Sequence, residues 1–156
     1  MMRGTSVEKN FYIKLSPKGY DFDEEEIFKN SNPKVKFVNR YSPMTEARKN
    51  ASLLIFSTIS TGHLEATASN YPFMILNVYP NFFKSEIEDI FMEMSKLGIL
   101  HFNAESLFMT LKNIENDIYS WWSSETLQTF IKKYRNNYAN VEDKFKLQKL
   151  KKVLKF

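Results

Sequence analysis

Short hydrophobic runs recur along the chain and are separated by longer, more polar segments. The runs lie at residues 11–15, 35–38, 53–56, 73–78 and 99–102. The first run alternates apolar and polar side chains, which is typical of a strand. The runs at 53–56 and 73–78 are nearly continuous, as in strands that are buried on both faces of a parallel sheet. The pattern therefore predicts a strand at each run, with 53–56 in the interior of the sheet.

The segments between these runs carry helix signals. Ser42 and Pro43 combine an N-cap with a proline at the first helical position, and Gly98 is suited to end a helix. The predicted helices begin within the acidic residues 21–26 and cover 42–50, 62–69, 83–96, 103–119 and 123–138.

Strands that alternate with helices in this way form parallel sheets with helices on both faces. We therefore expect an α/β fold, a three-layer Rossmann-like domain over residues 1–140. Its parallel sheet has about five strands, and the C-terminal helices pack on that sheet. A basic helical tail over residues 141–156 follows the domain.

Composition is that of an ordinary cytoplasmic domain. The 156 residues are enough for one domain with a buried core. The absence of cysteine excludes a disulfide scaffold, a cysteine zinc site and a cysteine nucleophile. The N-terminal residues lack the apolar core of a signal peptide, and no run of about 18 apolar residues occurs. We therefore expect a cytoplasmic protein without a membrane span.

Positive charge is concentrated at the C-terminal end. The formal net charge is +4, and no acidic residue follows Asp143. The lysine cluster of this tail consists of Lys144, Lys146, Lys149, Lys151 and Lys152. They form either a solvated helix end or a peripheral contact with an anionic surface such as the inner membrane. The rest of the chain is nearly neutral, which argues against a nucleic-acid partner.

The best candidate for a ligand site is the Ser/Thr loop, which we define as residues 57–63. It lies between a predicted strand and a predicted helix, where free backbone N–H groups bind anions. Its hydroxyl-bearing and small residues are Ser57, Thr58, Ser60, Thr61 and Gly62. Such residues suit a phosphate cradle, although the loop is neither a Walker A motif nor the glycine-rich dinucleotide fingerprint. The alternative is a helix that is simply capped by Ser60 or Thr61.

Other candidate residues each have a structural alternative. His63 can bind phosphate or transfer a proton, but a single histidine is more often a capping or surface residue. Glu65 can accept hydrogen bonds from a ribose diol, or it can balance the helix dipole. The adjacent Trp121 and Trp122 can stack on a base or a sugar, or they can anchor helices on the sheet. The consecutive acidic residues 21–26 are typical of a solvated turn, so no metal is expected.

Two groups of motifs resemble known families. The segment 57–72, with its hydroxyl residues, the pair Leu64-Glu65 and the closing Pro72, resembles the donor-binding segment of GT-B glycosyltransferases. The later motifs are Leu97-Gly98-Ile99-Leu100-His101, Ile114 to Asp117, Trp121-Trp122 and Gln128, followed by Tyr134 and Tyr138. These later motifs resemble a bacterial family of surface-polysaccharide transferases. The resemblance covers residues 10–140.

This resemblance implies a nucleotide-sugar donor and a role in bacterial cell-surface polysaccharide synthesis. It implies that the Ser/Thr loop, His63 included, holds the donor phosphates and that Glu65 holds the ribose or the sugar. It identifies no catalytic residue and implies no cofactor. GT-B enzymes have two Rossmann-like domains, and 156 residues suffice for only one of them. The resemblance therefore implies a fragment, a split enzyme that needs a companion N-terminal domain or chain, or a degenerate remnant. The alternative function is a non-catalytic α/β binding module, recruited to a membrane or a partner protein by its basic tail.

Overall fold

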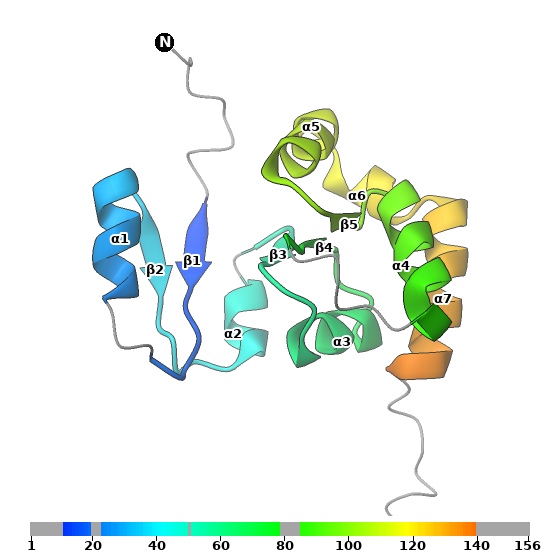
Figure 1. Cartoon of the computed structure of the whole chain (residues 1–156), viewed down its shortest axis with the longest axis horizontal. Coiled ribbons are helices and arrows are strands. Elements are labelled where there is room, and N and C mark those ends of the chain that lie inside the picture. The colour runs from blue at the N-terminus through cyan, green and yellow to red at the C-terminus, as the bar shows by residue number, and fades with distance from the viewer. Residues whose placement is uncertain (1–10, 20–22, 50, 79–84, 140–156) are drawn as a thin grey trace, which may run out of the picture. The chain divides into compact units, whose positions relative to one another are not determined.

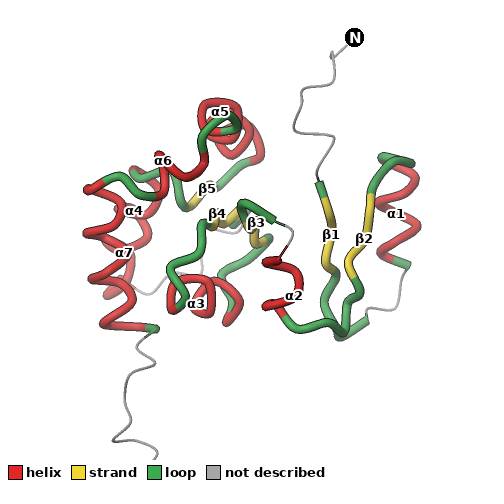
Figure 2. The backbone as a smooth tube through the Cα atoms, turned by 180° about the vertical axis from the view of Figure 1, so that it is seen from behind, coloured by secondary structure: helices red, strands yellow, loops and turns green. Residues whose placement is uncertain are grey.

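The computed structural model describes residues 11–19, 23–49, 51–78 and 85–139. The chain divides into two compact units, Met1–Ser52 and Leu53–Phe156. Each unit contains a parallel sheet with helices, as Figures 1 and 2 show. The predicted α/β class with parallel strands is therefore confirmed.

The first unit is built on a two-stranded sheet. Strand β1 (Tyr12–Lys14) pairs in parallel with strand β2 (Lys36–Val38). Helix α1 (Glu24–Ser31) connects the two strands, and helix α2 (Met44–Lys49) follows β2. This is one strand–helix–strand unit, in which a parallel pair needs a crossover connection.

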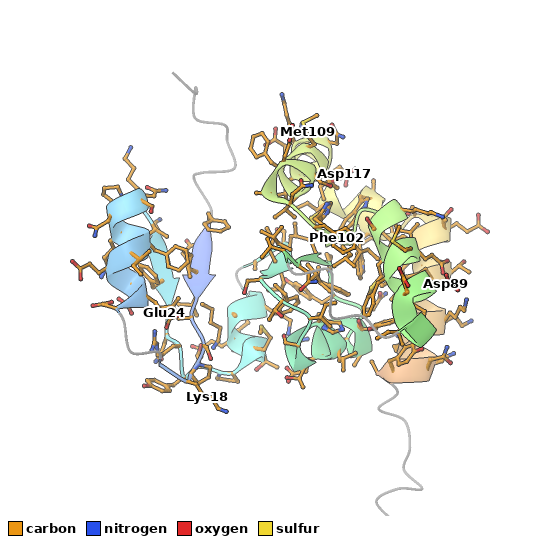
Figure 3. All side chains as sticks on the ribbon, in the orientation of Figure 1. Lys18, Glu24, Asp89, Phe102, Met109 and Asp117 are labelled. Atoms are coloured by element: carbon orange, nitrogen blue, oxygen red, sulfur yellow. The ribbon has the colours of Figure 1, made fainter. Side chains whose placement is uncertain are left out.

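Acidic residues open α1, as the sequence predicts. The side chain of Asp23 accepts a hydrogen bond from the backbone N–H of Glu26 at 3.1 Å and caps the helix. Glu24, labelled in Figure 3, forms an ion pair with Arg40 at 3.1 Å. The backbone oxygen of Arg40 in turn accepts a hydrogen bond from the ammonium group of Lys14 at 2.7 Å. These acidic residues therefore have a structural role at the helix start.

The second unit contains a three-stranded parallel sheet. Its strands are β3 (Leu54–Phe56), β4 (Phe73–Leu76) and β5 (Leu100–His101), in the order β3-β4-β5. Its helices are α3 (Thr61–Ala68), α4 (Ser85–Lys96), α5 (Ala104–Ile114), α6 (Ile118–Trp122) and α7 (Glu125–Tyr138).

Helices cover both faces of this sheet. Side chains alternate along a strand, so neighbouring residues of β4 face opposite sides. Phe73 and Ile75 belong to a buried cluster that includes residues of α3, α4 and α7. Met74 belongs to a second cluster with Leu107 and Ile114 of α5. Both views of the backbone accordingly show α3 and α5 on opposite sides of the strands (Figures 1 and 2).

The arrangement of the strands differs from the predicted one. In the described residues, the five strands form two sheets of two and three strands. A single sheet of five strands therefore stays a prediction. The segment 53–56 was expected in the interior of the sheet, whereas within the three-stranded sheet β3 is an outer strand and β4 is central. The side chains of β3 are only partly buried, and a continuous apolar run does not distinguish an edge from an interior strand.

The single helix predicted over 103–119 is wrong, because the structure divides it into α5 and α6. The carboxylate of Asp117, labelled in Figure 3, accepts hydrogen bonds from the hydroxyl of Ser120 at 2.6 Å and from its backbone N–H at 2.9 Å. These bonds, the one from the hydroxyl foremost, lower the pKa of Asp117. They also cap α6, so the chain starts a new helix where the hydrophobic pattern alone continues the old one.

The membrane-related predictions concern two different parts of the chain. In the described ranges, no helix has both the length and the apolar character that crossing a membrane requires. The basic tail, including its lysine cluster, falls within 140–156 and lies outside the described residues. The predicted tail helix and its membrane contact therefore stay predictions.

Candidate functional site

The Ser/Thr loop leaves the carboxyl end of β3 and leads directly into α3. The helix begins at Thr61, and Ser60 is its N-cap residue. The side chains of Ser57 and Thr58 are exposed, as are those of Ser60 and Thr61. The hydroxyl groups of the loop are therefore accessible to a ligand at the helix start.

Gly62 lets the helix pack closely on the strand before it. A Cβ atom at this position would lie 2.8 Å from Cε1 of Phe56. The Phe56 ring packs edge-on against Phe73 of β4, with ring centroids 6.1 Å apart. The sequence interpretation gave Gly62 a role in the approach of a phosphate, but the structure shows a packing role that no local pattern could predict.

His63 points into the fold. Only 3% of the residue is exposed, and its Nδ1 accepts a hydrogen bond from the backbone N–H of Ser60 at 3.1 Å. A glutamate or glutamine makes the same bond in an ordinary capping box. Because Nδ1 accepts, the neutral ring carries its proton on Nε2. Nε2 lies 3.1 Å from the hydroxyl oxygen of Tyr134 on α7, so this N–H donates to that oxygen.

Burial keeps this pair uncharged. It lowers the pKa of His63 from 6.5 and raises the pKa of Tyr134 to about 12. Both shifts follow from the cost of desolvating the charged form. With both ring nitrogens engaged inside the fold, His63 is placed to hold the loop rather than to touch a ligand. Sequence reasoning missed Tyr134 as its partner, because 71 positions separate the two residues.

Glu65 lies on α3, one turn after the exposed Thr61. Its side chain is exposed, and its backbone oxygen accepts hydrogen bonds from the N–H and the hydroxyl of Ser69 at 3.2 and 2.8 Å. The carboxylate is therefore open to a ligand from solvent. Within the described ranges, no three or more histidine, aspartate or glutamate residues are grouped so as to hold a metal ion.

The segment 97–101 builds the turn between α4 and β5. Gly98 adopts a φ of +72°, a conformation that favours glycine and ends the helix. His101 is buried; its Nε2 donates to the backbone oxygen of Gly98 at 3.0 Å, and its Nδ1 accepts from the hydroxyl of Ser106 at 2.9 Å. Burial lowers the pKa of His101. This histidine therefore fixes the turn.

The tryptophan and glutamine motifs meet in one hydrogen-bond ring. Trp122 is buried against Phe73, with ring centroids 5.5 Å apart, and its indole N–H donates to the backbone oxygen of Asn70 at 3.1 Å. The side-chain amide of Asn70 donates to Gln128 at 3.0 Å, and that of Gln128 donates to the backbone oxygen of Trp122 at 2.7 Å. Trp122 thus anchors helices. Asn70 directly follows the predicted helix 62–69 and has a φ of +50°.

A surface depression of about 280 Å³ lies away from the Ser/Thr loop. It is lined by Asn70, Glu125, Gln128, Thr129, Ile131, Lys132 and Arg135. Asn70 follows the end of α3, whereas the Ser/Thr loop precedes its start. Ligands of parallel α/β sheets bind beyond the carboxyl ends of the strands, which is the end where the loop lies. The Ser/Thr loop is therefore a better candidate for the ligand site than the depression is.

The fold and the loop together define an α/β protein with an exposed, hydroxyl-rich turn at the carboxyl end of a parallel strand. A family model described as LIC12162 family transferase matches residues 4–154, and the chain belongs to this family of transferases. The implied transferase class is thereby confirmed, while its GT-B and polysaccharide details stay predictions. No curated protein and no solved structure matches the chain.

Proposed function

We propose that the chain binds the nucleotide-sugar donor of a glycosyltransferase that acts in bacterial cell-surface polysaccharide synthesis, on the cytoplasmic side. Membership of a transferase family supports the transfer of a chemical group. The Ser/Thr loop is the observation on which the choice of donor depends. It exposes hydroxyl groups at the start of a helix, where a diphosphate finds both N–H and O–H donors.

In the proposed complex, the donor diphosphate lies at the start of α3. The backbone N–H groups of Thr61 and Gly62 belong to the first helical turn, which has no intrahelical acceptors for them. The loop hydroxyls add further donors, and the positive end of the helix dipole favours the negative charge. During transfer, an acceptor hydroxyl oxygen forms a bond to the anomeric carbon, its proton passes to the base of the companion, and the bond between the anomeric carbon and the phosphate oxygen breaks. The same donors stabilise the charge on the departing phosphate.

Glu65 is assigned to the ribose or the sugar. Its carboxylate is exposed and lies one turn beyond the proposed phosphate contacts. A carboxylate accepts two hydrogen bonds from neighbouring hydroxyl groups, as in a ribose diol. His63 supports the loop from inside and makes no proposed contact with the donor.

The proposal includes a companion N-terminal domain or chain and a single Rossmann-like sheet of five parallel strands, as in GT-B enzymes. The companion would bind the acceptor and supply the base. No described residue is assigned a catalytic role, so the activity is proposed for the assembled enzyme.

The direct test is binding of a panel of UDP-, GDP-, CMP- and TDP-sugars. A ligand that binds only the folded state stabilises it by about 2.7 kcal/mol at a concentration of 100 Kd. We expect one nucleotide class to raise Tm by several degrees, and the matching free sugar to leave Tm unchanged. A panel that produces neither a thermal shift nor heat in titration calorimetry contradicts donor binding.

A second proposal concerns the basic tail, whose five lysines between 144 and 152 are followed by no acidic residue. We propose that this tail brings the protein to an anionic membrane surface. Lysines near such a surface contribute about 1 kcal/mol each. Sedimentation with phosphatidylglycerol vesicles should therefore be strong, and weak with phosphatidylcholine vesicles. A chain that lacks residues 144–156 should lose this binding and keep its nucleotide affinity; equal binding of both chains would exclude the tail as the anchor.

A further inference from the structure

We infer that His63 and Tyr134 are positioning residues for the Ser/Thr loop, and that helix α7 thereby sets the geometry of the proposed phosphate site. The inference rests on the proposed function, which supplies the ligand. It concerns two side chains that face the interior: His63, which the resemblance implied as a phosphate ligand, and Tyr134, to which the resemblance gave no role.

Two consecutive hydrogen bonds connect the loop to α7. The backbone N–H of Ser60 donates to Nδ1 of His63 at 3.1 Å, and Nε2 of the same ring donates to the hydroxyl of Tyr134 at 3.1 Å. Both side chains are buried, with 3% and 6% of these residues exposed. The N-cap peptide of α3 is therefore held by His63 of the same helix, and the His63 ring is in turn held by Tyr134 of α7.

The first bond controls which N–H groups remain for a ligand. The N–H of Ser60 is used inside the fold, which fixes the orientation of the peptide at the N-cap. The next two N–H groups, of Thr61 and Gly62, belong to the first helical turn and extend from the helix end. A change in the His63 ring would rotate the N-cap peptide and move these donors relative to a bound phosphate.

The second bond keeps the His63 ring in one orientation. Without the hydroxyl of Tyr134, the N–H on Nε2 would lack its partner in a buried place, which is costly. The Tyr134 ring is itself held by two neighbouring rings. It stacks on Phe130, with ring centroids 5.8 Å apart, and it packs against Tyr138, with ring centroids 5.0 Å apart. The hydroxyl is therefore a fixed point from which the loop is positioned.

Protonation of His63 should loosen the loop. A proton on Nδ1 would face the N–H of Ser60 and remove the acceptor that caps α3. The other rings beside the imidazole are Phe73 of β4, which is apolar, and Tyr134 of α7, which stays neutral at physiological pH. On α3 itself, the hydroxyl of Thr67 donates to the backbone oxygen of His63 and bears no charge. The conformation of the Ser/Thr loop should therefore change with pH as His63 gains or loses its proton.

The experiment compares Tyr134→Phe and His63→Gln with the wild type by two readouts on the full chain. The first readout is the backbone amide NMR signals of residues 57–62, which needs no ligand. The second is the Kd of UDP between pH 5.5 and 7.5. Tyr138→Phe removes a hydroxyl one turn further along α7, and His101→Gln removes the other buried histidine; these are the matched controls.

We expect Tyr134→Phe to shift the loop amides and to weaken UDP binding about threefold to tenfold, as the loss of one hydrogen bond does. The wild type should bind UDP more weakly as the pH falls, and His63→Gln should reduce this pH dependence to the part that comes from the terminal phosphate of UDP, which itself titrates at about pH 6. Both control variants should leave the loop amide signals and the pH profile of UDP binding as in the wild type. If Tyr134→Phe does not fold, the signals and pH profile of His63→Gln decide the question.

The two proposals can fail separately. Unchanged loop amides and unchanged UDP affinity in Tyr134→Phe overturn the positioning role and leave donor binding intact. Shifted loop amides in a protein that binds no nucleotide support the positioning role and contradict the proposed ligand. A pH profile that His63→Gln leaves unaltered also overturns the inference.

Discussion

The indole N–H of Trp122 and the backbone oxygen of Asn70 are joined by a hydrogen bond of 3.1 Å, although 52 positions separate the two residues. The bond connects the last residue of α6 to the turn after α3. Gln128 closes the ring from the first turns of α7. One motif of the sequence therefore holds together three helices of the second unit.

Replacing Trp122 with phenylalanine should reduce the free energy of unfolding by about 1–3 kcal/mol. The variant keeps an aromatic ring against Phe73, but it loses the indole N–H and leaves part of a buried site empty. Urea denaturation followed by circular dichroism measures the change. Trp121→Phe is the control, because Trp121 is only partly buried. An equal or larger loss in the control would show that the hydrogen-bond ring is not the main anchor.

Gly62→Ala tests the packing of α3 on β3, because the substitution stabilises the protein if the site has room for a methyl group and destabilises it if the site does not. Alanine in place of glycine stabilises an unstrained helix by about 0.5–1 kcal/mol. Here the added methyl group would meet the Phe56 ring at 2.8 Å, and such overpacking costs about 1–3 kcal/mol. We therefore expect a lower Tm for Gly62→Ala in thermal unfolding.

Two further variants isolate the contact between Gly62 and Phe56. Gly19→Ala places a methyl group 3.6 Å from Arg40, an ordinary contact, so its Tm should stay near that of the wild type. Phe56→Leu combined with Gly62→Ala should lose less stability than the two single changes together. Strict additivity would mean that the two residues do not share a packing contact.

Local patterns were enough to predict the strands and most of the helices. The acidic opening of α1, the glycine at Gly98 and the turn before α3 all have chemical signals within a few residues. The division between α5 and α6 was missed, because the capping carboxylate of Asp117 outweighs a hydrophobic pattern that continues past it. Local signals therefore give the identity of an element more reliably than its ends.

The contacts between residues that are distant in the chain could not be predicted from the sequence. Periodicity does not say that β3 is an edge strand, since pairing depends on which strands meet in space. It also cannot show that His63 turns inward to Tyr134, because the partner lies on another helix. The exposed part of the candidate site was predicted from the loop chemistry, whereas its supporting contacts required the structure.

Stability should decrease as the pH falls from 7.5 to 5. Burial lowers the pKa of both His63 and His101 in the folded state from the ordinary value of 6.5. At pH values between the lowered pKa of the folded state and the pKa of 6.5 in the unfolded state, the unfolded chain binds more protons than the folded one. The free energy of unfolding therefore rises with pH in this range. The full contribution is present above pH 6.5 and is lost as the pH falls below it. Urea midpoints at a series of pH values measure this slope.

Substitution of the histidines separates their contributions to this slope. His63→Gln retains an acceptor for the Ser60 N–H, as in an ordinary capping box, but does not titrate. It should flatten part of the dependence, and the addition of His101→Gln should flatten most of the rest between pH 5.5 and 7.5. A double variant with the slope of the wild type would assign the pH dependence to other groups.

Thr61→Ala and Glu65→Ala should weaken nucleotide-sugar binding and leave stability nearly unchanged. Both side chains are exposed, and surface substitutions usually change stability by no more than about 0.5 kcal/mol. A lost hydrogen bond to a charged group costs about 1.5–3 kcal/mol, which is a tenfold to hundredfold rise in Kd. Titration calorimetry with the donor identified from the panel measures the change, and thermal unfolding gives the stability.

Thr129→Ala tells binding at the start of α3 apart from binding in the depression, which lies near the other end of α3. Thr129 is an exposed threonine of α7. It lines the depression together with Asn70, which follows the end of α3 opposite to the Ser/Thr loop. If the donor phosphates bind at the start of α3, this variant retains the affinity of the wild type while Thr61→Ala loses it. The reverse result would move the binding site to the depression on α7. Unfolding of Thr61→Ala would instead show that its hydroxyl supports the helix, because the loss would then appear in Tm before any ligand is added.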